Sequence, residues 1–214
     1  MKNWIIIISI VLLPSISFGQ IDTVTAINEF KLAINRTNIQ DSYSENLFGF
    51  GLGVYHVFLQ NKKVNLVTGL EYNRTNQLKK SIYDGHFAHK TNVTFNINCI
   101  SIPMTARINF GRKIKIFLNT GLFIDLSIGG REKGTMKTYF TNENDQLESK
   151  VFQYSQKSRL GSNYGFILGV GIDIPLYKYR IIVEPDYKFG MRNIYQEMDE
   201  IRNRYFRINI GLRI

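Results

Sequence analysis

Apolar and polar side chains alternate along this chain with a period of two residues, and the alternation recurs in segment after segment. In the final run, RYFRINIGLRI (204–214), every second residue from Phe206 to Ile214 is apolar, so the apolar side chains share one side of an extended strand. Seven earlier runs show the same pattern, near residues 30–37, 47–60, 63–74, 93–110, 113–128, 162–174 and 179–189. The sequence therefore predicts an all-β chain of eight antiparallel strands, with no helix after residue 19.

The connections between these runs alternate between short and long. Tight turns are predicted at Asn61-Lys62, Gly111-Arg112 and Tyr177-Lys178, whereas long polar gaps fall near residues 38–46, 75–92, 129–161 and 190–203. This alternation is typical of an eight-stranded antiparallel up-and-down transmembrane β-barrel of the bacterial outer membrane, with short periplasmic turns and long extracellular loops. An even strand number then places both termini in the periplasm.

A barrel in a bilayer has to close, because lipid offers no partner to unpaired backbone N–H and C=O groups. The last strand is therefore expected to pair with the first strand, near residues 30–37, and to turn its apolar side chains toward lipid. The predicted lipid-facing residues include Leu118, Leu122, Ile124, Leu168, Val170 and Ile210.

The first 19 residues have the pattern of a secretory signal peptide. A single positive charge at Lys2 precedes the apolar run WIIIISIVLL (4–13), and small residues follow at Ser17 and Gly19. The apolar run is well short of the roughly 20 residues that a spanning helix needs. We expect cleavage after Gly19 and a single outer-membrane barrel domain over residues 20–214.

The polar face of the strands carries charges of both signs: Lys31, Glu71, Arg107, Lys115, Asp125, Asp173, Arg180, Glu184, Asp186, Lys188 and Arg207. A secreted ligand-binding barrel or a β-sandwich could show the same alternation, but its apolar face would point inward. Burying these charges in an apolar cavity would cost too much desolvation energy. In an eight-stranded membrane barrel they fill the narrow lumen instead, which argues against a large diffusion pore.

Pro103 is unusual because it lies within a predicted strand, where a proline removes one backbone donor. Nearby, the apolar residues change parity, from Phe95 and Ile97 to Ile100 and Ile102. A bulge around Asn98–Cys99 would explain this change and would leave residues 100–110 as the part that crosses the membrane. Cys99 is the only cysteine, so no intramolecular disulfide can form.

Three segments, ISIPMTARINF (100–110), KIFLNTGLFIDLSIGG (115–130) and YGFILGVGIDI (164–174), resemble the small outer-membrane β-barrel family common in Bacteroidota, labelled porin-family or PorT-like. The most specific part of the resemblance is Ile-Pro followed one strand later by Thr-Gly-Leu. The chain departs from the family at Gly121, which no proline follows, and at Ile214, where barrels often end in an aromatic residue. The resemblance implies an alternative function, an accessory component of a protein secretion or translocation system.

Two short motifs could indicate a site. The glycines of FGFGLG (48–53) resemble a phosphate-binding loop but recur with a period of two and precede no helix, so we expect a packed lumen face, as for Gly165, Gly169 and Gly171. Asp84, His86 and His89 could bind a metal or act as acid and base at the rim. No third strong ligand or serine nucleophile accompanies them. We therefore predict no catalytic, cofactor-binding or metal-binding residue, and a rim or lumen enzyme stays an alternative.

Charge and loop length indicate the partners. The formal net charge is +10, yet an exported chain without a basic helix is not expected to bind nucleic acid. The cations of the short turns are expected either to contact anionic lipid head groups or simply to keep the turns soluble; they are Lys62, Lys63, Arg112, Lys113 and Lys178.

The longest gap, 129–161, carries four aromatic residues, Tyr139, Phe140, Phe152 and Tyr154. Amphipathic aromatic residues are common on recognition surfaces. The sequence thus predicts a non-enzymatic integral outer-membrane protein whose extracellular loops serve binding or envelope structure. The expected partners are outer-membrane lipids, lipopolysaccharide, the barrel assembly machinery, and an extracellular or secretion-system protein.

Overall fold

The computed structural model describes residues 27–37, 44–60, 62–83, 87–158, 160–194 and 202–214. The predicted signal peptide, Asp84 and His86 lie outside these residues. The strands are β1 (Glu29–Thr37), β2 (Ser44–Asn46), β3 (Phe48–Phe58), β4 (Val64–Tyr83), β5 (Ala88–Phe110), β6 (Lys115–Thr141), β7 (Leu147–Lys157), β8 (Asn163–Leu176), β9 (Tyr179–Asn193) and β10 (Arg202–Arg213). Within the described part of the chain, no helix is long and apolar enough to cross a membrane.

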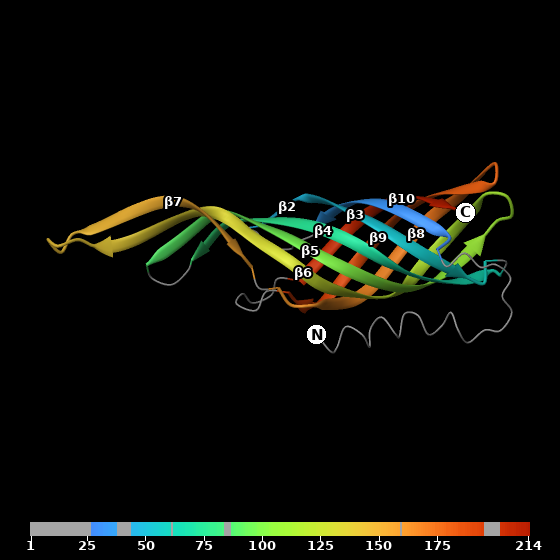
Figure 1. Cartoon of the computed structure of the whole chain (residues 1–214), viewed down its shortest axis with the longest axis horizontal. Coiled ribbons are helices and arrows are strands. Elements are labelled where there is room, and N and C mark those ends of the chain that lie inside the picture. The colour runs from blue at the N-terminus through green and yellow to red at the C-terminus, as the bar shows by residue number, and fades with distance from the viewer. Residues whose placement is uncertain (1–26, 38–43, 61, 84–86, 159, 195–201) are drawn as a thin grey trace.

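Eight of the described strands form a closed antiparallel ring (Figure 1). Their order around the ring is β1, β3, β4, β5, β6, β8, β9 and β10, and the pairing of β10 with β1 completes it. The short strand β2 pairs with β4, and β7 pairs with β6, both outside the ring. The predicted eight-stranded up-and-down barrel is therefore confirmed.

The first and last strands close the barrel, as predicted. Their register runs from Glu29 opposite Arg213 to Thr37 opposite Tyr205. The ladder continues past β10, because the Ile214 N–H donates to the Asn28 carbonyl at 3.0 Å. The final strand thus stays hydrogen-bonded up to the last residue of the sequence.

The two faces of the strands separate apolar from polar side chains. All six residues predicted to face lipid are exposed on the outer surface, with Leu168 and Ile210 each 60% exposed. On β10, the residues that alternate with the outward-facing ones, such as Arg207 and Asn209, are buried inside the barrel. The predicted outward and inward faces are thus confirmed.

The three short turns lie at one end of the barrel, which is also where the C-terminus lies (Figure 1). One of them requires a glycine: Gly111 has a φ of 93°, and a Cβ atom there would meet the Ile114 carbonyl oxygen at 2.4 Å. We call this end of the barrel the turn end.

The bulge predicted around Asn98–Cys99 falls at the expected place, but it does not lie on β5. Inward-facing residues continue at every second position from Val93 through Cys99 to Asn109. The pairing does shift opposite Asn98–Cys99, but the extra residue is Ile128 on β6, since Asn98 pairs with Gly129 and Cys99 with Ser127. The apolar side chains of residues 93–97 therefore point into the barrel and pack there.

Pro103 interrupts one ladder, as expected for a residue without a backbone N–H. Its side chain faces inward, and the β4–β5 pairing is missing between Thr68–Met104 and Glu71–Ser101. Thr68 Oγ1 donates to the Pro103 carbonyl at 3.0 Å, which satisfies that oxygen. On its other side, β5 keeps its pairing with β6 through Pro103 opposite Phe123.

Four strands continue beyond the barrel at the end opposite the turn end (Figure 1). We call this projection the arm; it comprises residues 81–83 of β4, 88–92 of β5, 131–141 of β6, and β7. The β4–β5 pairing reaches Tyr83–His89, and the β6–β7 pairing reaches Thr141–Leu147. The gaps predicted as loops at 75–92 and 129–161 are thus largely paired strands.

Candidate functional site

The barrel interior near the turn end is held by a network of ion pairs around Glu29 and Arg107. Arg107 donates to both carboxylate oxygens of Glu29, at 2.8 and 2.9 Å. Arg213 donates to Glu29 at 2.8 Å and to Asp173 at 2.9 Å. These contacts join β1, β5, β8 and β10 across the lumen.

The network continues through Lys31 to Glu184. Lys31 Nζ donates to Glu184 at 2.5 Å and lies 3.1 Å from Glu29. Arg107 lies 3.7 Å from the same Glu184 carboxylate. Each charge in this part of the lumen therefore has a partner of opposite sign on another strand or a neighbouring residue.

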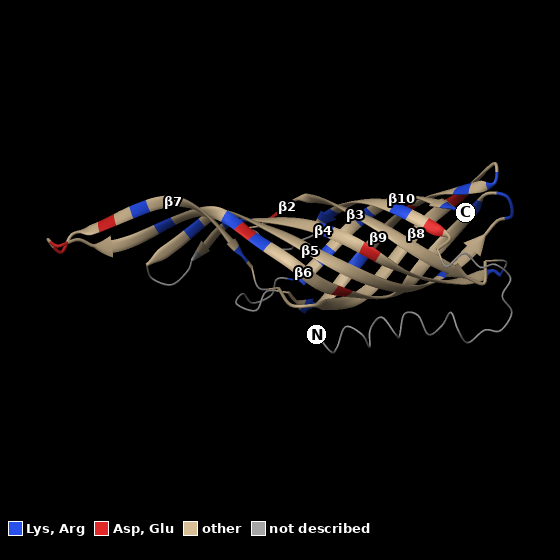
Figure 2. Ribbon diagram, viewed as in Figure 1, with Lys and Arg blue, Asp and Glu red and all other residues tan. Residues whose placement is uncertain are grey.

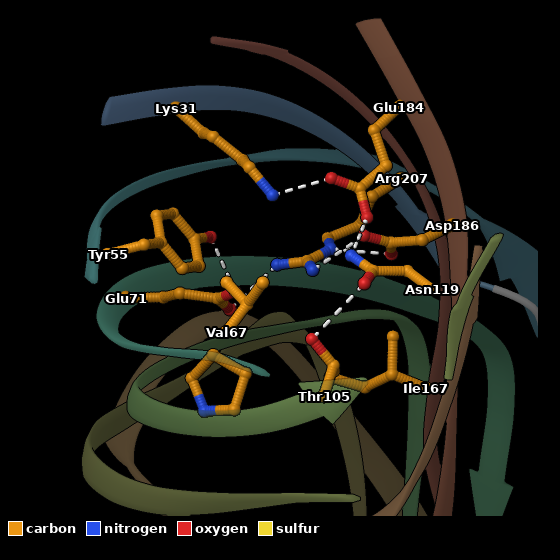
Figure 3. Close-up of a pocket in the computed structure, with 11 residues that line it drawn as sticks. Lys31, Tyr55, Val67, Glu71, Thr105, Asn119, Ile167, Glu184, Asp186 and Arg207 are labelled. Atoms are coloured by element: carbon orange, nitrogen blue, oxygen red, sulfur yellow. Dashed lines mark hydrogen bonds and ion pairs between the residues drawn. The ribbon is translucent and has the colours of Figure 1, made fainter. Parts of the chain in front are cut away.

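A second network lies around Arg207 (Figure 3). The β1–β10 register places it further from the turn end than Glu29 and Arg213. Arg207 makes two hydrogen bonds to the Asp186 carboxylate, at 2.8 and 2.7 Å, and a third to Glu71 at 2.7 Å. Glu71 also accepts from Lys188 at 2.6 Å and from the Tyr55 hydroxyl at 2.6 Å. Bidentate Arg–carboxylate pairs of this kind fix both distance and orientation.

Charges in the lumen are balanced. Among the described residues, six bases take part in the lumen ion pairs, namely Lys31, Arg107, Arg180, Lys188, Arg207 and Arg213. Six acids face them, namely Glu29, Glu71, Asp125, Asp173, Glu184 and Asp186. The positive surplus of the chain therefore lies outside the lumen network.

All but one of the charges predicted for the lumen lie in this network. Lys115 is the exception, because it is half-buried at the turn end and forms no ion pair with the described residues. Glu29 and Arg213 were missed as lumen charges. Glu29 lies one residue before the predicted first strand, and Arg213 already lies on the polar side of the final run, so extending the alternation by one residue would have found both.

Side chains fill the lumen. The void that Lys31, Tyr55, Glu71 and Arg207 line has a volume of about 10 Å³ (Figure 3). A single water molecule needs about that much space. The described interior is therefore a packed polar core around this void. It leaves no opening there that is wide enough for a solute to pass.

An apolar cluster closes the lumen toward the arm. Val93, Phe95, Ile97 and Ile194 are at most 2% exposed and pack together, with Ile82 and Leu160 against them. Phe95 and Ile97 come from the stretch of β5 whose parity the sequence misassigned. The lumen is thus polar near the turn end and apolar near the arm.

The glycines of FGFGLG lie within β3 and do not form a phosphate-binding loop. A Cβ atom on Gly53 would lie 2.8 Å from the Tyr55 hydroxyl, and one on Gly51 would lie 2.5 Å from the Asn73 side chain. The predicted packed lumen face is therefore confirmed, because these glycines make room for larger neighbours.

The rim histidine His89 lies in the arm, on β5. Its Nε2 atom is 2.7 Å from the Ser81 hydroxyl on β4. Among the described residues, no three His, Cys, Asp or Glu side chains lie close enough together to hold a metal ion. The predicted companions Asp84 and His86 lie outside the described residues.

The arm has its own small polar cluster at its base. Glu132 accepts hydrogen bonds from the Tyr154 hydroxyl and from Gln156 at 3.3 Å. Lys90 lies 3.5 Å from Glu132 and 5.5 Å from the centre of the Tyr154 ring. These contacts tie β7 to β5 and β6, so the arm is anchored to the strands that enter the barrel.

A family model for the outer membrane protein beta-barrel domain matches residues 18–196. The chain belongs to this family. It is therefore an integral outer-membrane protein. Its finer resemblance to PorT-like proteins of Bacteroidota stays a prediction.

Solved structures of outer-membrane barrels are similar to this chain in fold. Neisserial surface protein A is 13% identical, with 88% of this chain and 95% of that chain covered and a TM-score of 0.51. The attachment invasion locus protein Ail of Yersinia pestis, in complex with the heparin analogue sucrose octasulfate, is 12% identical, with 87% and 95% covered and a TM-score of 0.40. The N-terminal barrel of Pseudomonas aeruginosa OprF is 13% identical, with 87% and 98% covered and a TM-score of 0.35. No curated protein matches the chain.

Two groups of outward-facing aromatic residues mark the membrane interfaces of this outer-membrane barrel. Near the turn end they are Phe30, Phe110, Tyr177 and Tyr179, and near the arm they are Phe48, Phe50, Tyr164, Phe166, Phe189 and Phe206. Aromatic girdles flank the apolar band of outer-membrane barrels in this way. The exposed Leu, Ile and Val residues between the two girdles form that band.

The five cations of the short turns lie beyond the girdle at the turn end (Figure 2). Lys62, Lys63, Arg112, Lys113 and Lys178 are all exposed. Lys63 lies 5.8 Å from the Phe110 ring centre, and Lys178 lies 5.7 Å from that of Tyr179. Cations beside the interfacial aromatics are well placed to meet anionic head groups.

The filled lumen predicts that the purified outer-membrane barrel conducts little or nothing. Steady open channels should be absent in planar-bilayer recordings, because the ion-pair networks and the apolar cluster obstruct the interior. A reference porin in the same bilayer provides the positive control. Steady channels of porin size would contradict the packed interior.

Proposed function

We propose that this outer-membrane barrel is a non-enzymatic binding protein whose arm captures an extracellular partner. One observation carries the proposal: the arm ends in a free edge strand, since β7 pairs only with β6 among the described strands. Nearly every residue of β7 is exposed, including Leu147 at 71% and Val151 at 60%. A free edge of this kind can add a strand from a partner.

The proposed orientation places the arm outside the cell and both termini in the periplasm. The short turns are at the turn end, and short connections face the periplasm in outer-membrane barrels. At that side the cations of the turns would contact the anionic lipid of the inner leaflet. The arm, at the opposite end, then reaches beyond the outer leaflet.

The free backbone groups of β7 can be assigned to alternate residues. Ser158 donates to Gly130 and Asn142 donates to Gln146, which fixes the hydrogen-bonded pairs at both ends of the β6–β7 hairpin. Hydrogen-bonded and non-hydrogen-bonded pairs alternate along an antiparallel ladder. The even-numbered residues of β7 therefore bond to β6, and odd-numbered ones such as Val151 and Gln153 point their N–H and C=O groups to the free edge.

Replacing residues 131–158 by a short turn is predicted to leave the barrel folded and to abolish its biological role. The pairing of the eight ring strands is kept from Ile97–Gly130 toward the turn end, whereas β5 loses its β6 partner over residues 88–96 and the whole of β7 is lost. The measurement is complementation of a strain that lacks the gene, with outer-membrane assembly checked by heat-dependent migration on a gel. The control is His89→Ala, for which we expect little effect.

A point substitution tests the free edge of β7 while the rest of the arm stays in place. Gln153→Pro removes one N–H from the free edge and leaves the β6–β7 ladder intact, so it should impair function more than Gln153→Ala. Full complementation by the 131–158 deletion would contradict the proposal and favour a role in secretion. An inactive His89→Ala variant beside an active deletion would instead favour a rim enzyme.

A further inference from the structure

The outer end of β7 has a sequence that is complementary to itself. Residues 147–151 read LESKV: an apolar residue at each end, an acid and a base next to them, and a serine in the middle. We call this stretch the tip segment. If two copies lie antiparallel with their Ser149 residues opposite each other, Leu147 of each copy meets Val151 of the other. Glu148 of each copy likewise meets Lys150 of the other. Both apolar pairs and both ion pairs are then matched.

The backbone of β7 fits the same register. The odd-numbered residues of β7 point their N–H and C=O groups to the free edge, because the even-numbered ones bond to β6. In the register centred on Ser149, odd-numbered residues face odd-numbered residues, and each such pair exchanges two hydrogen bonds. Glu148 and Lys150 then fall in non-hydrogen-bonded pairs, where opposite side chains come closest. Backbone and side chains are therefore satisfied together.

The side chains of the tip segment are accessible to a second chain. All of its residues are exposed, and Leu147 and Val151 are the most exposed large apolar side chains of β7. The Glu148 carboxylate accepts a hydrogen bond from Asn142 at 2.8 Å, in the turn of the same hairpin, and stays exposed. Pairing of two tip segments would remove the apolar side chains from water and give each charge a partner of opposite sign.

The antiparallel register determines how the two barrels lie. The arm continues along the long axis of the barrel, and β7 runs along the arm (Figure 1). Two copies in one membrane point the same way, so their β7 strands are parallel. Parallel pairing in register sets each charge beside its own copy, and a shift by two residues pairs only one of the two charges. Antiparallel pairing instead requires barrels that point in opposite directions.

We propose that the tip segment binds the tip segment of a second copy in a facing membrane, so that the chain links two outer membranes. This contact goes beyond the capture of an extracellular partner, because it leaves Gln153 and the rest of the free edge open. It does rest on the orientation proposed above, with the arm outside the cell. Stable interfaces bury roughly 1,200 Å² or more, so one short strand pair is weak. Many copies on two facing membranes act together.

The test measures clustering of phospholipid vesicles that contain the purified full chain. Two vesicle populations carry different dyes, and protease added outside should trim the arm, which shows that the arms face out. Vesicles with the chain should cluster with one another and not with empty vesicles, because lipid offers no strand to pair. A lack of clustering, or equal clustering with empty vesicles, would overturn the proposal.

A proline at the centre of the register tests the strand pairing. Ser149→Pro removes the N–H that each copy donates at the centre and should abolish clustering, whereas Ser149→Ala should cluster like the unmodified chain. Gln153→Pro makes the same change on the free edge outside the tip segment and should cluster normally, although it is expected to impair the capture proposed above. The two proposals can therefore fail separately. Undiminished clustering by Ser149→Pro, or an equal loss in Gln153→Pro, would contradict the register.

A charge exchange tests the side-chain pairing at constant net charge. The double variant Glu148→Lys, Lys150→Glu is again complementary to itself, so its vesicles should cluster with one another. Against the unmodified chain, acid faces acid and base faces base, so mixed clusters should be lost. Heat-dependent migration shows that each variant is folded. Mixed clusters as frequent as those of either chain alone would overturn the proposed register.

Discussion

Arg207→Met is expected to lower the free energy of unfolding by about 3–5 kcal/mol, the typical cost of removing one partner from a buried ion pair. Asp186 would lose both hydrogen bonds from the guanidinium group and keep only an amide donor, the Asn209 Nδ2 at 2.7 Å. Glu71 would lose one bond but keep Lys188 and Tyr55. Urea unfolding in phospholipid vesicles measures the change.

A double variant tests whether the unpaired charge causes this loss. Arg207→Met with Asp186→Asn removes the carboxylate that the single variant leaves without a cation, so it should be more stable than Arg207→Met alone. Arg192→Met, at an exposed arginine on β9, should change stability by no more than about 0.5 kcal/mol. A double variant less stable than the single one would show that packing, not charge, dominates at this position.

The strands of the barrel wall could be predicted because each has one face in lipid and the other in a polar lumen. Because the two faces differ, apolar and polar residues alternate along each strand. In β10, Ile208 and Ile210 face out, whereas Arg207 and Asn209 face in. Closure also follows from physics, since an unpaired strand edge is too costly in a bilayer. No further information was needed to predict that β1 pairs with β10.

The arm could not be predicted in the same way, because the two faces of its outer strand, β7, do not differ in burial. In β7, LESKVFQYSQK, nearly every residue is exposed, so the sequence carries no alternation that would distinguish a strand from a loop. Backbone pairing with β6 forms this strand. The inward orientation of Phe95 and Ile97 could not be predicted for a related reason, since both are apolar yet face the lumen, where they pack in an apolar cluster.

Val170→Arg is expected to cost about 2–4 kcal/mol, because it places a charge on the lipid face near the middle of β8. Val170 is 51% exposed and lies between the arm-side girdle at Phe166 and the turn end of the strand. Urea unfolding in the same vesicles gives the free energy of unfolding.

The depth of the substituted residue in the membrane, and not the change to arginine itself, should determine how much stability is lost. Leu176→Arg makes the same change on the same face of β8, but at its turn end, where the long arginine side chain reaches the head groups. Its cost should therefore be only about 0–1 kcal/mol. Equal losses at Val170 and Leu176 would mean that the apolar band does not centre near residue 170, and no loss at either would mean that this face does not contact lipid.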